Sequence, residues 1–275
     1  MNAVVTSLDR YQPSHSNAFQ STLSGEALRE RAPAVFASGA HERTSPAYTF
    51  ISTQAVLAAL ASAGFLPVEA RQAARARSPM HARHLIRLRR RAETVRLRDS
   101  LPELLFLNSH DGTSCYQLRA GLFRVACTNG LVVSMGVFPV WRVMHRGDVV
   151  RDVVCAALRI SERFEHLAAA VERMERTVLD AEQRLEFARQ ALALRFPEDA
   201  AGAMQTSLAL VPHRPEDVGN DLWRTFNTVQ SAILRGGLTR RSPSNRLTRT
   251  RPIRAIREDL RLNSALWEMA IARAQ

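Results

Sequence analysis

The spacing of apolar residues changes twice along the chain, and each change predicts a different kind of structure. Residues 52–65 place their apolar side chains on one helical face, with Ser52 in position to cap the first turn and Gly64 to end the last. From 66 to 145, apolar and polar residues alternate with the period of β-strands. From residue 148 onward the period is again that of a helix. The fold class expected is α+β: an antiparallel β-meander packed with one very long helix and a helical C-terminal part.

The segment NSHDGTSCYQLRAGLFRVACTNG, residues 108–130, predicts the turns of that meander. Its Asp-Gly and Asn-Gly dipeptides each lie between two apolar runs, and both dipeptides suit turns whose central residues need a positive φ. Ser109, His110 and Asp111 also lie here as sequence neighbours. Because adjacent strand residues point to opposite faces, we do not expect these three to converge as a catalytic triad.

Residues 148–196 are predicted to form a single helix. Apolar residues recur every three or four positions from Val150 to Leu192, with Asp148 placed to cap the start and Pro197 to end it. Such a helix could pair with a second copy of the chain as a coiled coil, or pack within the chain. Arginines at facing positions of a parallel pair make packing within the chain at least as favourable as a homo-oligomer.

Two shorter helices are predicted at about 216–235 and 252–273, separated by a basic linker. The expected domain organisation is therefore an α+β domain over 1–147 and a helical part over 148–275. We expect the helical part to pack on the sheet as one unit.

The charged residues exclude several classes of protein and favour one class of partner. The net charge is +12, all 38 basic residues are arginine, and lysine is absent. Without lysine the chain cannot supply a P-loop lysine, a protein-kinase strand lysine or a Schiff base. Three cysteines are too few for a disulfide framework, and no apolar run approaches the length needed to cross a bilayer. We therefore expect a cytoplasmic protein that does not bind a membrane. The basic charge predicts a polyanionic partner, and DNA is favoured over RNA.

The arginines are concentrated in two regions. Residues 71–98 contain ten arginines and one acid, and the segment 239–257 is also strongly basic. In the first region the alternation predicts two strands that pair as a hairpin, each with three arginines on one side. The predicted phosphate ligands are Arg71, Arg75, Arg77, Arg83, Arg87 and Arg89 on the sheet, with Arg240, Arg241, Arg246 and Arg249 as a flexible arm.

Two segments resemble a known family. LNSHDGTSCYQLRAGLFRVACTNGLVV is similar to the core of the domain of unknown function 932 family, the phage/plasmid-like proteins, and LWRTFNTVQSAILRGG to its tail. The resemblance spans 25–272. It implies an accessory protein of a plasmid, phage or integrated element, and no particular reaction. The residues that carry it are Ser109, His110, Asp111, Gly112, Arg119, Gly121, Arg124, Cys127, Asn129, Gly130, Asn227, Gln230, Arg235, Gly236 and Gly237.

The leading hypothesis is a nucleic-acid-binding accessory protein, with a role in DNA recombination, repair or maintenance, and without enzymatic activity. One alternative is an enzyme whose site lies where the Ser109–Asp111 turn, Cys127 and Asn227 converge. Another is a protein-binding module that acts on a host factor through the long helix. Paired CxxC ligands are absent, so we expect no metal and no cofactor. Asn227 and Gln230 are more readily explained as structural amides than as ligand contacts.

Overall fold

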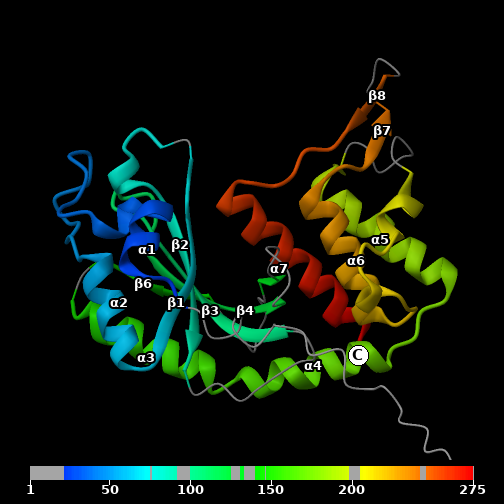
Figure 1. Ribbon diagram of the computed structural model, residues 1–275, viewed down its shortest axis with the longest axis horizontal. Coiled ribbons are helices and arrows are strands. Elements are labelled where there is room, and N and C mark those ends of the chain that lie inside the picture. The colour runs from blue at the N-terminus through cyan, green and yellow to red at the C-terminus, as the bar shows by residue number, and fades with distance from the viewer. Residues whose placement is uncertain are drawn as a thin grey trace, which may run out of the picture.

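An antiparallel sheet lies between two groups of helices (Figure 1). The computed structural model describes residues 22–74, 76–91, 100–124, 131–132, 140–145, 147–197, 205–241 and 246–274. Among these, the sheet has the order β1–β2–β3–β4–β5, and β6 pairs with β4 beside β5. The strands are β1 Phe65–Gln72, β2 His84–Arg90, β3 Ser100–Asn108, β4 Tyr116–Arg124, β5 Leu131–Val132 and β6 Trp141–Val143. The predicted α+β class and the antiparallel meander are confirmed.

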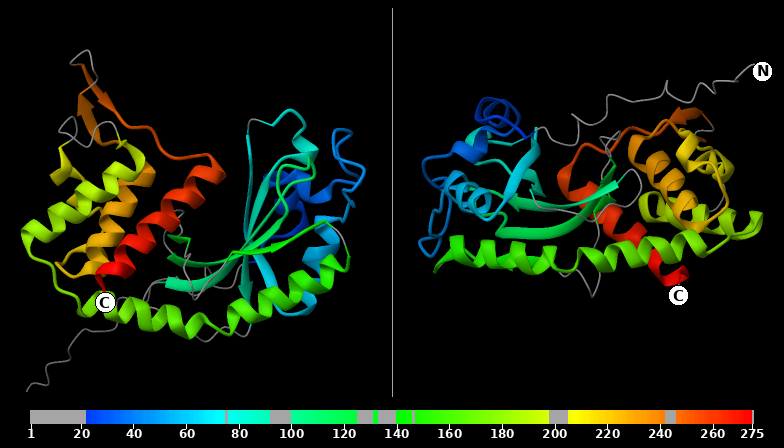
Figure 2. Two further views of the ribbon diagram at one scale, coloured as in Figure 1. Left: turned by 180° about the vertical axis from the view of Figure 1, so that it is seen from behind. Right: turned by 60° about the horizontal axis from the view of Figure 1, so that its bottom comes forward.

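The alternation of side chains divides the sheet into two different faces. One face carries Leu104, Phe106 and Leu118, which are fully buried in the main core. The helices α1 (Gly25–Arg31), α2 (Thr53–Ser62) and α3 (Val149–Ser161) cover this face. Figure 2 shows them on one side of the strands. The predicted cap is confirmed, because Ser52 Oγ accepts a hydrogen bond from Ala55 N at the start of α2.

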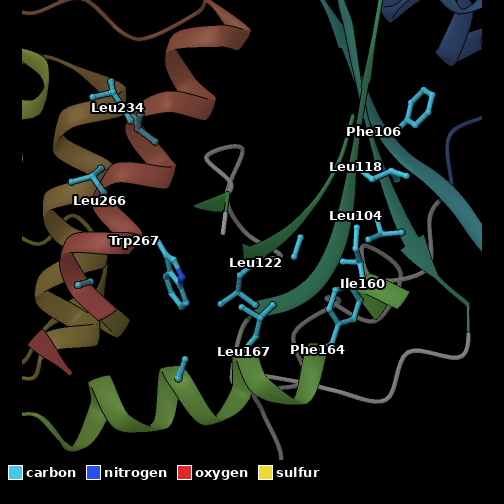
Figure 3. Packing of buried hydrophobic residues seen from close by; sticks show 14 of the residues in the cluster. Leu104, Phe106, Leu118, Leu122, Ile160, Phe164, Leu167, Leu234, Leu266 and Trp267 are labelled. Carbon is cyan, nitrogen blue, oxygen red and sulfur yellow. The ribbon is translucent and has the colours of Figure 1, made fainter. Parts of the chain in front are cut away.

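The single helix predicted over 148–196 is wrong. The structure has three helices there: α3, α4 (Phe164–Arg176) and α5 (Ala181–Arg195). The first two follow one another below the sheet, and α5 then turns into the C-terminal bundle (Figure 1). Figure 3 shows Ile160, Phe164 and Leu167 from this pair of helices beneath the sheet. A protein interface along one long helix therefore has no structural basis here.

Pairing with a segment distant in sequence separates α4 from α5. Leu179 N donates to Asn220 O at 2.8 Å, and Leu222 N donates to Thr177 O at 2.8 Å. Residues 177–180 are thereby drawn into an extended conformation. A new helix then begins at the capping box formed by Asp180 and Gln183. Val178, assigned to the apolar stripe from its spacing, is 65% exposed as a result.

The C-terminal helices form a bundle beside the sheet. Helix α6 (Leu222–Arg235) packs between α5 and α7 (Ile256–Arg273), and a β-hairpin joins α6 to α7. The two helices that were predicted here are confirmed with shorter bounds. Helix α7 also reaches the second face of the sheet, where its Ile256 and Leu260 form a small separate core with Leu85, Leu105, Leu107 and Phe123. None of the helices in the described part of the chain has both the length and the apolarity needed to cross a membrane.

Candidate nucleic-acid interface

The first predicted hairpin forms, and its Arg71, Arg87 and Arg89 share one face of the sheet. Strand β1 pairs with β2 so that Arg71 lies opposite Leu85 and Glu69 opposite Arg87. Because side chains at alternate positions point the same way, Arg89 lies on that face too. Arg77 lies in the connection after β1 and not on a strand. Arg75 is outside the described residues.

Carboxylates engage three of these arginines. Glu103, fully buried on β3, accepts hydrogen bonds from Arg87 Nε at 2.7 Å and from Arg89 Nη2 at 2.6 Å. Arg87 also pairs with Glu69, and Arg71 pairs with Asp259 of α7. Breaking a buried ion pair leaves an uncompensated charge, which is strongly destabilising. These arginines therefore hold the sheet and α7 together, and phosphates would have to compete with their carboxylate partners.

A different group of arginines lines a cleft of about 700 Å³ between the same face of the sheet and α7. Arg83 precedes β2, Arg119 is on β4, Arg142 is on β6, and Arg257 is in the first turn of α7. We call this the arginine cleft. It forms because β6 pairs with β4 in a register that sets Arg142 opposite Gln117, two residues from Arg119. None of these four arginines forms an ion pair with a carboxylate of a described residue.

Three buried donor groups in the arginine cleft lack a hydrogen-bond partner among the described residues: Arg83 Nε, Arg119 Nε and Ser264 Oγ. The other contacts of the two guanidinium groups are weak. Arg83 Nη2 donates to Thr113 O at 3.3 Å, and Arg119 Nη2 donates to Gln117 Oε1 at 3.2 Å. Buried polar groups in proteins are normally paired, so these three donors could bind an acceptor that enters the cleft.

The local charge of the cleft favours an anion over a cation as such an acceptor. Burial lowers the pKa of Arg119, and the nearby Arg142 lowers it further. A guanidinium group still remains protonated, so positive charge accumulates in the cleft. A fifth arginine of the lining, Arg261, is neutralised by Glu258, and Glu268 is a carboxylate of the lining itself. A phosphate accepting from these donors would satisfy the orphans and the charge together.

Sequence reasoning identified part of the arginine cleft. Arg83 belonged to the predicted hairpin, and Arg119 belonged to the family motif. Arg142, Arg257 and Ser264 were missed. Arg257 ends the basic segment 239–257, which was a usable signal, but nothing local distinguishes Arg142 or Ser264.

The Ser-His-Asp-Gly motif forms a structural polar network and a turn. Thr53 Oγ1 lies 3.1 Å from His84 Nε2 and 3.0 Å from His110 Nε2, and it accepts from Asn108 Nδ2 at 3.1 Å. His110 therefore contacts Thr53 and does not pair with Asp111. Asn108 Oδ1 is in turn 3.1 Å from His145 Nε2.

Burial keeps these imidazoles neutral. It lowers the pKa of His84 to about 4 and that of His110 to about 3, and in His110 the neighbouring histidines add to the effect. The pKa of His145 is lowered by burial as well. Within the described residues, no group of three or more His, Cys, Asp or Glu side chains is arranged to hold a metal ion.

Asp111 and Gly112 make the turn that the sequence predicted. Asp111 Oδ1 accepts from Thr113 N at 3.0 Å and from Thr113 Oγ1 at 2.6 Å, and Gly112 has φ +77°. Burial alone would raise the pKa of Asp111, but these hydrogen bonds and one from Ser109 outweigh it, so the pKa lies below its usual value. Ser109, His110 and Asp111 do not form a triad, as expected.

Comparison with known proteins places the chain in a family. The family model described as Domain of unknown function (DUF932) matches residues 40–267. This chain belongs to the DUF932 family. It is 39% identical over 251 residues to UPF0380 protein YfjQ of Escherichia coli (strain K12), covering 90% of each chain. It is 38% identical over 253 residues to UPF0380 protein YafZ of the same organism, covering 91% of each. No solved structure matches it.

On β4 of this DUF932 protein, Gly121 lies opposite Glu103 and Arg124 opposite Ser100. Cys127, Asn129 and Gly130 fall outside the described residues.

The second motif segment of this DUF932 protein serves the helical bundle. Asn227 Nδ2 donates to Trp223 O at 2.7 Å, and Gln230 Nε2 donates to Asn263 Oδ1 of α7 at 2.7 Å. Both amides are buried on α6, in agreement with the structural interpretation. Asn227 is therefore committed to its own helix, so these contacts do not link it to the Ser109–Asp111 turn.

Arg235, Gly236 and Gly237 end α6 and begin the second basic region. Gly236 is the C-cap of α6, with φ +72°. The predicted arm is a β-hairpin within the described residues: β7 (Thr239–Arg241) pairs with β8 (Leu247–Arg249). Arg240 is half-buried near the ring of Phe196. The arginines of this hairpin that are exposed are Arg241, Arg246 and Arg249.

Proposed function

We propose that this DUF932 protein binds nucleic acid and that the arginine cleft holds phosphates of the backbone. The observation that carries the proposal is the set of orphaned donors, Arg83 Nε, Arg119 Nε and Ser264 Oγ, in a cleft lined by arginines. Guanidinium groups recognise phosphate by charge-assisted, often bidentate hydrogen bonds. Backbone contacts of this kind position a protein on nucleic acid without reading its sequence.

A polymeric anion fits the rest of the molecule better than a small one. The net charge of +12 draws polyanions from a distance, and each phosphate that is neutralised releases counterions. The exposed arginines of the β7–β8 hairpin extend the positive surface beyond the cleft. A role in DNA recombination, repair or maintenance on a plasmid or phage stays a prediction that rests on the family resemblance. The cytoplasmic location likewise stays a prediction.

The salt dependence of binding tests the proposal. A fluorescent DNA duplex of about 30 base pairs is titrated by anisotropy at several salt concentrations, with the wild type and with Arg142→Gln and Arg257→Gln. Both arginines are exposed, so neither change disturbs the core. Each variant is expected to bind more weakly and to reduce the slope of log K against log salt by about 1.

Arg176→Gln is the matched control. The side chain of Arg176 is 80% exposed on α4 and forms an ion pair with Glu172 of the same helix. Its removal changes the net charge by the same amount, so it should leave the slope as in the wild type. A wild-type slope near zero, or cleft variants that behave like Arg176→Gln, would contradict the proposal.

A further inference from the structure

The β7–β8 hairpin projects from the helical bundle (Figure 1). It lies in a segment with a high density of basic residues. The segment 239–257 contains seven arginines and no acid. Arg241, Arg246 and Arg249 of the hairpin are exposed, and so are Arg251 and Arg254 in the connection to α7. A segment with such an excess of basic residues attracts a polyanion.

The base of the hairpin is built firmly onto the bundle. Gly237 N donates to Thr250 O at 2.8 Å, and Thr250 N donates to Leu238 O at 2.9 Å. Arg195 at the end of α5 donates to the carbonyl oxygens of Ile233 and Arg251, which joins α5, α6 and the hairpin. The hairpin is therefore a fixed two-stranded ribbon where it leaves the bundle.

The ribbon presents an exposed apolar side chain among its arginines. Leu247 of β8 is 66% exposed and is flanked in sequence by Arg246 and Thr248. It does not belong to either hydrophobic core of the described residues. Proteins that enter a groove of DNA often place an apolar side chain against a thymine methyl group or a base step.

The exposed side chains also distinguish single-stranded from duplex nucleic acid. Proteins that bind single strands stack the bases on exposed aromatic rings. In the part of the chain that the structure describes, the exposed large apolar residues include no aromatic residue: they are Met80, Met144, Val178, Leu185, Val211, Val218 and Leu247. The described surface therefore offers phosphate contact and groove contact, which favours a duplex.

We infer that the paired strands β7 and β8 lie in the major groove of B-form duplex DNA while the arginine cleft holds the adjacent backbone. The inference rests on the proposed function and specifies its substrate class. The major groove of B-form DNA is about 12 Å wide and admits a two-stranded ribbon, whereas the major groove of A-form RNA is too narrow for side chains to read.

The chain segment between the hairpin and the arginine cleft limits the distance between these two DNA-binding sites. Residues 250–255 run from the hairpin to the start of α7, where Arg257 lines the cleft (Figure 1). The eight residue steps from Arg249 to Arg257 span at most about 28 Å. That distance corresponds to about eight base-pair steps of duplex. One duplex molecule is thus long enough, within a single helical turn, to touch both sites.

Binding to three nucleic acids of matched sequence tests the inference: a DNA duplex of about 30 base pairs, one of its strands, and the corresponding RNA duplex. The DNA duplex is expected to bind at least about ten-fold more tightly than the other two. Leu247→Ser and Arg249→Gln should each weaken binding to the DNA duplex about five-fold or more, because each removes a groove or phosphate contact. Their affinity for the single strand should stay within about two-fold of the wild type.

Matched controls for the two hairpin variants are available elsewhere on the surface. Val218→Ser removes another exposed apolar side chain, and Arg176→Gln removes another exposed arginine. Both should bind the duplex as the wild type does. Methylation of guanine N7, which lies in the major groove, should interfere with binding, and methylation of adenine N3, which lies in the minor groove, should not.

The outcomes separate the inference from the proposed function. If the single strand or the RNA binds as tightly as the DNA duplex, the inference fails. It also fails if only adenine N3 methylation interferes, or if the hairpin variants bind the duplex normally while Arg142→Gln weakens it; in these cases the cleft remains a phosphate site. If none of the three nucleic acids binds, the proposed function fails as well.

Discussion

Hydrogen bonds to Ala82 and Thr53 determine which ring nitrogen carries the proton in two buried histidines. His84 Nδ1 lies 2.9 Å from Ala82 O, so it carries the proton and leaves Nε2 as an acceptor for the Thr53 hydroxyl. The Thr53 oxygen then accepts from Asn108 Nδ2 and from His110, whose proton must be on Nε2. His110 Nδ1 is left as a buried lone pair without a partner among the described residues. Every polar hydrogen of this network is donated in a hydrogen bond only while both imidazole rings are neutral.

Acid should therefore destabilise the protein by protonating these histidines. A histidine whose folded pKa is below its unfolded value of about 6.5 contributes full stability above that pH and loses it as the pH falls. For His84 the loss extends from about 6.5 to about 4, and it amounts to about 2 kcal/mol at pH 5. Urea unfolding at pH 7.5 and pH 5.0 measures the loss.

Two variants show whether the network is the cause. His110→Gln retains an amide donor for Thr53 and cannot titrate, so it should reduce the difference in unfolding free energy between the two pH values. His166→Gln, on the exposed surface of α4, should leave that difference unchanged. Equal behaviour of the two variants would count against the network.

At the scale of elements, Gly236 determines how the hairpin leaves α6. Its φ of +72° suits glycine, and a Cβ built there would lie 2.6 Å from Thr250 O and 2.7 Å from the carbonyl carbon of Arg251. Backbone atoms cannot rotate away as a side chain can. The close approach lets Gly237 and Leu238 pair with Thr250, so this glycine connects the end of a helix to a strand pair.

Gly236→Ala is expected to lower the free energy of unfolding by about 2–3 kcal/mol, from the left-handed backbone and from the contact with Thr250. Gly64→Ala is the matched control. Gly64 has φ +89°, but nothing lies within 4 Å of its would-be Cβ, so only the backbone cost of about 1 kcal/mol applies. Chemical denaturation of both variants gives the comparison. Equal losses of unfolding free energy would show that the backbone at Thr250 shifts to accommodate a Cβ with little loss of stability.

At the scale of the whole molecule, α7 joins the helical bundle to the sheet. Asp259 pairs with Arg71 of β1 and accepts from Asn263 Nδ2 at 2.6 Å, while Asn263 Oδ1 accepts from Gln230 of α6. Polar contacts thus run from one part of the protein to the other, beside the small core around Leu260. The same docking of α7 sets Arg257 and Ser264 against the arginines of the sheet, so the arginine cleft depends on it.

Asp259→Asn should weaken this joint. It removes the charge that pairs with Arg71 and places an amide group against Asn263, for an expected loss of about 2 kcal/mol in the free energy of unfolding. Glu258→Gln is the neighbouring control, because its partner Arg261 is half exposed and such pairs contribute at most about 1 kcal/mol. Urea unfolding of both variants measures the difference. An equally large loss of unfolding free energy for Glu258→Gln would contradict a special role of Asp259 in joining α7 to the sheet.

The local pattern of the sequence was sufficient for several of the elements. Alternation predicted the β1–β2 hairpin and the strands of the meander, Asp111-Gly112 predicted a turn, and Ser52 predicted a helix start. These features depend on neighbours within a few residues, since side-chain direction and capping are set by the local backbone. The family motif also identified Arg119 before the structure showed what surrounds it.

Tertiary structure alone decided which charges remain available. Alternation placed Arg87 and Arg89 on one face correctly, but Glu103 approaches them from β3, and no local window contains that pairing. The break at 177–180 likewise depends on residues 220–222. The arginine cleft brings together side chains from β4, β6, α7 and the residue before β2. Periodicity encodes which way a side chain points, whereas the groups it meets depend on chain segments that are distant in sequence.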